Sequence, residues 1–276
     1  MFIADIHFGQ HDGKVEGMVT PDMKQYYTMR AKTLAEVEKY NPEFVVLGGD
    51  LVLYPKNYHL GYPESYAFLT NYIKRPLHVM PGNHDMYHMD VAELGGKHER
   101  GKDYWDKYYN TYYHSFDYGK FHVICVNTTD WPDKYILWGP ENTSTGTLLS
   151  VGIQKEQFMW MKEDLERAAA TSSDRIVCGH IPFHNIVSGK TLGLPPQKLP
   201  GASEEKIMGL LNDTGVKNLF VGHLHINDVK TLDGGITENM IRNVGADYFD
   251  SEKAGFAVVH VRGGKLSGYD LIDVTI

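Results

Sequence analysis

Seven side chains of metal-binding type, with one further histidine beside them, stand directly after apolar segments of this 276-residue chain. They fall into five short motifs, each at the end of a stretch predicted to be a strand. In chain order the motifs are Asp5-Ile6-His7, Gly49-Asp50, Gly82-Asn83-His84-Asp85, Gly179-His180 and Gly222-His223-Leu224-His225. Because ligands gather outside the carboxyl ends of the strands in an open α/β sheet, we expect all five motifs to meet at one rim.

The donor types suit a pair of metal ions. Imidazole, carboxylate and amide oxygen without a thiolate favour Mn, Fe, Zn or Co. Asp5 and His7 are two residues apart, so in an extended chain their side chains leave the same face and can bind one ion together. Asp50 has two carboxylate oxygens and is predicted to bridge both ions. Taken singly, Asp-X-His is more often a surface pattern and Gly-Asp more often a polar turn, so the prediction depends on the order of the motifs and their shared position.

The other motifs add a neutral ligand and three imidazoles. Asn83 offers an oxygen without charge, and a Gly-His-X-His segment after a strand is a known ligand pattern, which predicts His223 and His225 as ligands. His180 follows an apolar strand in the same way. His84, next to Asn83, is left free for acid–base chemistry.

The first half of the chain alternates strand and helix, which predicts a parallel sheet covered by helices. The predicted strands are Phe2–Ala4, Glu43–Leu47 and Leu77–Met80, and the helices are 20–40 and Glu64–Ile73. Residues 86–118 break this rhythm and are predicted to form an excursion over the site, with a short helix from about Asp103.

The second half continues the alternation and then changes. Strands are predicted at Phe121–Val126, Arg175–Cys178 and Lys217–Val221, and helices at Ile153–Ala170 and 203–212. The tail holds strands without helices between them, at Met240–Val244, Gly255–Val261 and Lys265–Ile272, with Gly263-Gly264 as a hairpin signal. This predicts a second, more antiparallel sheet within a single domain spanning 1–276.

Composition excludes some classes of function. The net charge of -8 gives no general attraction to nucleic acid, and no basic stripe supports a nuclease. No segment approaches the ~20 apolar residues that span a bilayer, and no signal peptide is present, so the cytoplasm is the default location; a removed leader upstream of residue 1 would look the same. Cys125 and Cys178 lie in apolar runs and are predicted to be buried free thiols.

The ordered motifs resemble those of the calcineurin-like metallophosphoesterases, whose pattern is D-X-H, G-D, G-N-H-D/E, H and G-H-X-H. The resemblance runs from Asp5 to His225 and implies an α/β fold, a four-layer α-β-β-α sandwich of two mixed sheets flanked by helices, with a dinuclear metal site at strand carboxyl ends. It implies one ion held by Asp5, His7, Asp50 and His225, and the other by Asp50, Asn83, His180 and His223. His84 would protonate the leaving oxygen, and Asp85 would orient His84.

The sequence differs from two known branches of this family, which narrows the expected branch. The Asp-Arg-Gly motif of the protein Ser/Thr phosphatases is missing after Asp50. Leu53 stands where purple acid phosphatases have a tyrosine ligand, and Tyr54 is one residue further. What remains resembles the cyclic-nucleotide-phosphodiesterase-like branch.

The resulting hypothesis is hydrolysis of a small-molecule phosphodiester by a metal-bridging hydroxide, with His84 as general acid. His88 and His184, with the tyrosines of 104–113, are candidate substrate contacts; for the tyrosines the alternative is packing of the loop onto the domain. The other functions considered are a phosphomonoesterase on the same site, a non-catalytic metal-binding scaffold, and a dinuclear hydrolase of amides or lactones, which usually opens with His-X-His. The sequence predicts no particular oligomeric state.

Overall fold

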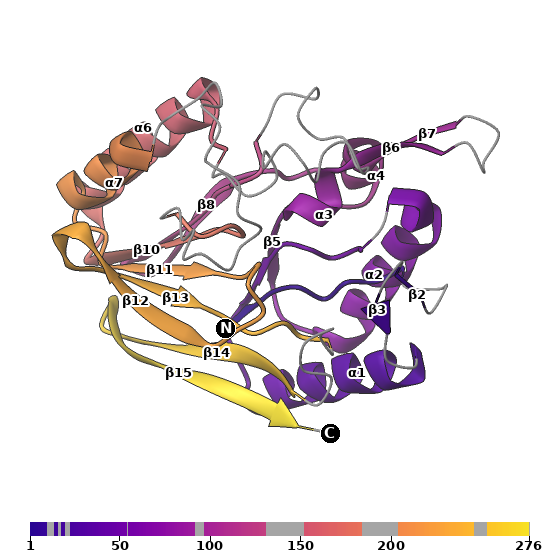
Figure 1. Ribbon diagram of the computed structural model, residues 1–276. Helices are drawn as coiled ribbons and strands as arrows, with labels where there is room; N and C mark the ends of the chain where they lie inside the picture. Colours follow the sequence, from indigo (N-terminus) through magenta and orange to yellow (C-terminus); the bar gives the residue numbers. More distant parts are fainter. Residues whose placement is uncertain are drawn as a thin grey trace.

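The structure is a computed structural model that describes residues 1–9, 14–15, 18–19, 23–53, 55–91, 97–130, 152–183, 204–245 and 253–275. Two mixed sheets lie face to face, and helices cover the outer face of each (Figure 1). These are the four layers that the family resemblance implies.

The first sheet has the strand order β15-β14-β1-β4-β5. Three short parallel strands form its centre and one edge: β1 (Phe2–Ile3), β4 (Val45–Gly48) and β5 (Leu77–Met80). The antiparallel hairpin of β14 (Lys253–Arg262) and β15 (Lys265–Thr275) completes it. Helices α1 (Met23–Lys39) and α2 (Tyr58–Tyr72) pack on its outer face.

The second sheet has the order β12-β13-β11-β10-β9-β8. Its strands are β8 (His114–Tyr118), β9 (Phe121–Cys125), β10 (Asp174–Cys178), β11 (Asn218–Val221), β12 (Asp228–Leu232) and β13 (Ile236–Met240). The four central strands are parallel, and β8 and β12 run antiparallel at the edges. Helices α6 (Lys155–Thr171) and α7 (Glu204–Asp213) cover the outer face.

Shorter elements connect the two sheets with the rest of the chain. They are the pairs β2 (Lys14–Val15) with β3 (Met18–Val19) and β6 (His88–Val91) with β7 (Lys97–Arg100), helices α3 (Asn83–Met86) and α4 (Gly101–Tyr108), and 3₁₀ turns at Pro55–Asn57 and Asp233–Gly235. Two of these elements matter for the site, because α3 begins at the third motif and α4 packs against both α2 and α3.

Alternation along the strands builds three apolar layers. On β4, Val46 faces the space between the sheets, while Val45 and Leu47 face α1 and α2. On β9, Val123 faces the same central space, whereas Ile124 packs towards the helices of the second sheet. Successive side chains of a strand point to opposite faces, so a strand buried on both faces has a continuous run of apolar residues. Such a run precedes each motif.

The tail strands are divided between the sheets, and here the prediction of a second, more antiparallel sheet was wrong. β13 joins the second sheet in parallel, but β14 and β15 return to the first, where Phe2 of β1 pairs with Val46 on one side and Ala257 on the other. A two-residue central strand is stabilised only by neighbours on both sides, and pattern along the chain does not say which sheet a hairpin joins.

Three further elements differ from the prediction. β13 ends at Met240, where a strand was predicted to begin, and β12 was not predicted at all. Helix α2 begins at Tyr58 rather than Glu64 and passes through Pro63. Burial of Tyr58 and Tyr62 along this helix outweighs the hydrogen bond that proline removes. The hairpin at Gly263-Gly264 is confirmed, with both glycines at positive φ.

The segment 86–118 forms more regular structure than an excursion. It contains the hairpin β6–β7, helix α4 and the edge strand β8, which belongs to the second sheet. The helix expected from about Asp103 begins at Gly101. That this segment lies over the site, and that 1–276 is one domain, stay predictions.

The two cysteines are buried and free, as predicted. Cys125 and Cys178 are paired in register on the neighbouring strands β9 and β10. Burial raises the pKa of the Cys125 thiol, which keeps it protonated. Both thiols therefore act as small apolar side chains of the central layer.

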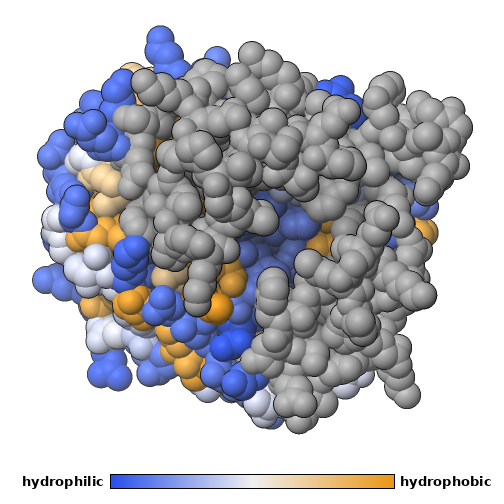
Figure 2. All heavy atoms as spheres, in the orientation of Figure 1, coloured by the Kyte–Doolittle hydropathy of each residue, from blue (hydrophilic) through white to orange (hydrophobic). Residues whose placement is uncertain are grey.

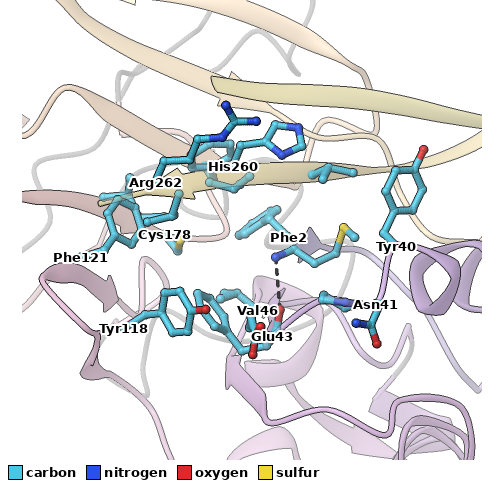
Figure 3. A pocket seen from close by; sticks show the side chains of 18 residues that line it. Phe2, Tyr40, Asn41, Glu43, Val46, Tyr118, Phe121, Cys178, His260 and Arg262 are labelled. Atoms are coloured by element: carbon cyan, nitrogen blue, oxygen red, sulfur yellow. Dashed lines mark hydrogen bonds between the residues drawn. The ribbon is translucent and has the colours of Figure 1, made fainter. Parts of the chain in front are cut away.

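A cavity of about 380 Å³ lies between the sheets, lined from both of them by residues that include Phe2, Phe121 and Cys178. Aromatic side chains line it, among them Phe2, Tyr118 and Phe121, with Arg262 at its border (Figure 3). Within the described residues no helix combines the length and the apolar character that crossing a bilayer requires.

A buried ion pair in the second sheet gives a prediction about stability. His122 is 3% exposed, with Nδ1 at 2.8 Å from Asp117 Oδ1 and Nε2 at 2.8 Å from Asp164 Oδ2. Burial lowers the pKa of His122, but the hydrogen bonds to Asp164 and Asp117 outweigh it and the net pKa is raised. The contacts of His122 with the two carboxylates therefore stabilise the fold below pH ~6.5, the pKa of histidine in the unfolded chain. This stabilisation is lost as the pH rises through the higher pKa of His122 in the folded protein.

We expect the wild type to lose more unfolding free energy between pH ~6 and ~9 than His122→Gln, by about 1.4 kcal/mol for each unit of the shift. Urea denaturation of both proteins across this range measures the difference. Other titrating groups are common to the two proteins and cancel. Parallel pH profiles would show that His122 is not charged in the folded protein.

Candidate metal centre

Two clusters of ligand-type side chains lie at the carboxyl ends of the parallel strands. The first contains Asp5, His7 and His225, and the second contains Asp50, His180 and His223. In each cluster the ligand atoms lie within 4.8 Å of one another. Residues 218 positions apart in the chain are brought into contact, since His7 Nε2 is 3.1 Å from His225 Nε2. The expected convergence of the motifs is thus seen in space.

The first cluster is centred on one carboxylate oxygen. Asp5 Oδ1 is 3.3 Å from His225 Nε2 and 3.8 Å from His7 Nε2. The other oxygen, Oδ2, accepts a hydrogen bond of 2.9 Å from the backbone amide of His223. One oxygen therefore fixes the side chain, and the other faces the two imidazoles.

The second cluster includes the asparagine of the third motif. His180 Nε2 lies 3.2 Å from Asp50 Oδ2 and 3.0 Å from Asn83 Oδ1. His180 Nδ1 donates to the Gly48 carbonyl at 2.7 Å, which turns Nε2 towards the cluster. A hydrogen bond of this kind sets the tautomer of metal-binding histidines.

Asp50 joins the two clusters. Its Oδ2 lies 3.2 Å from His180 Nε2 of the second cluster and 3.8 Å from His7 Nε2 of the first. Its Oδ1 accepts a 2.9 Å hydrogen bond from the backbone amide of His84. The side chain is 1% exposed, so its charge needs partners on every side.

The backbone at the clusters is not extended, which corrects the reasoning used for Asp5 and His7. Five of the candidate ligands have φ between 51° and 71°: Asp5, His7, Asp50, His223 and His225. This left-handed conformation costs non-glycine residues on the order of 1 kcal/mol each. Hydrogen bonds of 2.9 Å from Asp5 N to Gly49 O and from His7 N to Asp50 O hold it in place. Strained backbone of this kind is concentrated at functional sites.

Two glycines of the motifs are required because a ligand carboxylate lies close to the backbone of each. A Cβ on Gly82 would lie 2.2 Å from Asp50 Oδ1, and a Cβ on Gly222 would lie 2.4 Å from Asp5 Oδ2. Both distances are far below contact. Any side chain at these positions would displace the carboxylates that face the clusters.

The charges of the second cluster form an ion pair. Burial lowers the pKa of His180, but the carboxylates of Asp50 and Asp5 outweigh it and raise the pKa to about 9. Burial and the charge of His180 lower the pKa of His223 to about 3. Because cations bind only unprotonated imidazole, a metal in this cluster must displace the His180 proton.

A test of whether the residues fit metal ions comes from an atom without a partner. Asp5 is fully buried, and within the described part of the chain its Oδ1 has no hydrogen-bond donor. A buried carboxylate oxygen without a partner is costly in a folded protein. It faces Nε2 of His7 and Nε2 of His225, so a cation at this point would give all three atoms a common partner. The donor set therefore fits the two ions.

His84 and Asp85 lie at the start of α3, but their contacts differ from the expectation. His84 Nδ1 is 2.6 Å from the Leu53 carbonyl, and its ring lies 5.1 Å from that of His7. Asp85 accepts backbone amides from Leu51 at 2.9 Å, Val52 at 3.2 Å and Gly82 at 2.8 Å. Nδ1 of the His84 ring thus shares a hydrogen bond with the Leu53 carbonyl, and Asp85 ties together the backbones of the second and third motifs.

A family model of the calcineurin-like phosphoesterases matches residues 1–227, the stretch that holds all seven candidate ligands. The chain belongs to this family. A search of curated proteins finds no match to this chain.

Solved structures share the fold at low sequence identity. A dimetal phosphatase from Danio rerio is 12% identical with a TM-score of 0.65, over 99% of this chain and 97% of that one. The purple acid phosphatase PPD1 from yellow lupin is 14% identical with a TM-score of 0.56, over 98% of this chain and 52% of that one. A 5′-nucleotidase from Candida albicans is 12% identical with a TM-score of 0.52, over 99% and 50%. At such identities the likeness shows the fold alone.

Two of the predicted substrate contacts fall where their side chains are not described. His184 lies outside the described residues, and of His88 the structure describes only the backbone, in β6. The tyrosines of α4 pack against α2: Tyr104 stacks on Tyr62 with ring centroids 5.4 Å apart. These contacts favour the packing interpretation of the aromatic cluster.

The sequence did not identify the side chains that bind the backbone of the ligand residues. Thr128 Oγ1 accepts the backbone amides of His180 at 3.2 Å and Ile181 at 2.8 Å. Arg30, 5% exposed, donates from Nε to the Ile6 carbonyl at 2.5 Å and from its terminal nitrogen to the His7 carbonyl. Neither stands in a motif, and no sequence signal identifies a side chain that contacts a ligand's backbone.

Proposed function

We propose that this calcineurin-like phosphoesterase hydrolyses a phosphodiester at a two-metal centre, with His84 as the general acid. The proposed ligands of one ion are Asp5, His7, Asp50 and His225, and those of the other are Asp50, Asn83, His180 and His223. The observation that supports this most strongly is the position of Asp50, whose Oδ2 faces imidazoles of both clusters. When bound, the two ions supply a hydroxide nucleophile at neutral pH and stabilise charge on the phosphate oxygens.

The role of His84 is supported by its hydrogen bond. A carbonyl oxygen only accepts, so the 2.6 Å contact with Leu53 places a proton on His84 Nδ1. Nε2 is then the nitrogen that exchanges a proton with the leaving oxygen. The ring lies beside His7, next to the first cluster, so this nitrogen is held near the phosphate position.

The charge of the ligands alone favours a diester over a monoester. Asp5 and Asp50 contribute two negative charges to the clusters, whereas burial and the charge of Asp50 raise the pKa of Asp85 to about 8. Counting only the two ligand carboxylates, two divalent ions and one hydroxide, a diester monoanion brings the centre to neutrality and a monoester dianion leaves it negative. The structural neighbours named above are a dimetal phosphatase, a purple acid phosphatase and a nucleotidase, so the monoester is the second candidate.

The experiment that tests this proposal compares bis-p-nitrophenyl phosphate with p-nitrophenyl phosphate. The protein is first freed of metal and then reconstituted with Mn, Fe or Zn. We expect metal-dependent turnover with the higher kcat/KM on the diester. A higher kcat/KM on the monoester would reverse the substrate assignment, and bound metal without turnover on either ester would favour a scaffold. An amide and a lactone in the same assay test the remaining hydrolase class.

A further inference from the structure

The side chain of Asn83 is held by a tyrosine that stands four residues later. Asn83 Nδ2 donates a 2.7 Å hydrogen bond to the hydroxyl of Tyr87. Helix α3 makes one turn between them, and residues four apart on a helix are neighbours on its surface. Asn83 is 3% exposed and Tyr87 is 2% exposed, so water does not compete for this bond.

This contact decides which end of the amide faces the cluster. A carboxamide has an oxygen that binds cations and a nitrogen that does not, and the two ends are nearly equal in size. With Nδ2 on Tyr87, Oδ1 points to His180 Nε2 at 3.0 Å. In the reverse orientation the NH₂ group would face the imidazole and the incoming cation. Burial raises the pKa of Tyr87, so its hydroxyl stays a neutral partner.

We propose that Tyr87 is a positioning residue for the second metal ion, because its hydroxyl fixes the Asn83 amide with the oxygen towards that ion. This inference rests on the proposed two-metal function. Groups that hydrogen-bond to a metal ligand typically change metal affinity 10–100-fold. Loss of the hydroxyl leaves the buried NH₂ group facing an apolar ring whenever the oxygen binds metal, so the affinity of one site falls while the other site keeps its ligands.

The test substitutes Tyr87→Phe, which keeps the ring and therefore its edge contact with His84, at 5.4 Å between centroids. The matched control is Tyr62→Phe, which removes a buried hydroxyl of α2 that donates to the Asp85 carbonyl of α3 at 2.7 Å. Titration of the metal-free proteins with Mn²⁺ or Zn²⁺, by calorimetry or against a chromophoric chelator, gives both affinities. Circular dichroism and thermal unfolding monitor the fold of each variant.

We expect Tyr87→Phe to weaken one of two sites by ~10–100-fold, and Tyr62→Phe to leave both unchanged. Excess metal should restore the kcat of Tyr87→Phe to near that of the wild type. Asn83→Ala should weaken the same site, and the double variant Asn83→Ala/Tyr87→Phe should be no weaker than Asn83→Ala alone, because the hydroxyl acts only through the amide.

Equal affinities in Tyr87→Phe and the wild type would overturn the inference, as would equal losses in Tyr87→Phe and Tyr62→Phe. Additive losses in the double variant would show that Tyr87 does not act through Asn83. If instead the wild type binds fewer than two ions, the proposed function itself fails, so the two failures are distinguishable.

Discussion

Replacing Asp50 with Asn is expected to reduce turnover by more than ~100-fold, since even a partner of a metal ligand can account for that much. Asp50 Oδ2 is the atom that lies between the two clusters, 3.2 Å from His180 Nε2 and 3.8 Å from His7 Nε2. An amide carries no charge, so its oxygen binds two cations weakly and does not offset their repulsion. We expect the bound metal, measured by elemental analysis, to fall from two ions per chain to one or none.

The same substitution should change His180. The pKa of His180 is raised to about 9 mainly by the Asp50 carboxylate, against the effect of burial. In metal-free Asp50→Asn this pKa should fall, and imidazole NMR signals across a pH titration would show the change. The matched control is Asp164→Asn, another buried carboxylate, which belongs to the ion pair with His122. That variant should lose stability but retain two ions; full metal content in Asp50→Asn would remove Asp50 as the shared ligand.

Replacing His84 with Ala is expected to slow hydrolysis of alkyl esters ~10²–10⁴-fold, the usual contribution of a general acid. The hydrogen bond to Asp50 comes from the backbone amide of His84 and survives the substitution, so both ions should stay bound. p-Nitrophenolate leaves without protonation, and its ester should therefore be affected much less. The measurement is kcat for a series of diesters whose leaving groups differ in pKa.

A steeper dependence on leaving-group pKa in His84→Ala than in the wild type identifies the lost proton donor. His78→Ala provides the control, because His78 lies on the edge strand β5 and contacts His114 rather than the clusters. Equal slopes in wild type and His84→Ala would remove His84 from proton transfer. Loss of metal in His84→Ala would instead assign it a structural role at the centre.

Much of this arrangement can be predicted from the chain alone. The apolar runs before Asp5, Asp50, Asn83, His180 and His223 form strands whose last residues are buried, because that part of each strand is covered on both faces. Parallel strands end at the same edge, which is why five motifs spread over the chain predict one rim. The ligand types at that rim, and hence the class of chemistry, followed from this topology together with the family pattern.

The tertiary structure decided what depends on contacts between distant segments. The left-handed backbone of Asp5 and His7 is imposed by hydrogen bonds to Gly49 and Asp50, so residue spacing predicted an extended chain instead. The partners of Asp85 and His84 are backbone groups, which every residue carries and no sequence pattern distinguishes. Likewise β14 pairs with β1, so that β14 and β15 belong to the first sheet. This pairing is a contact between segments far apart in the chain, and the residue pattern does not predict it.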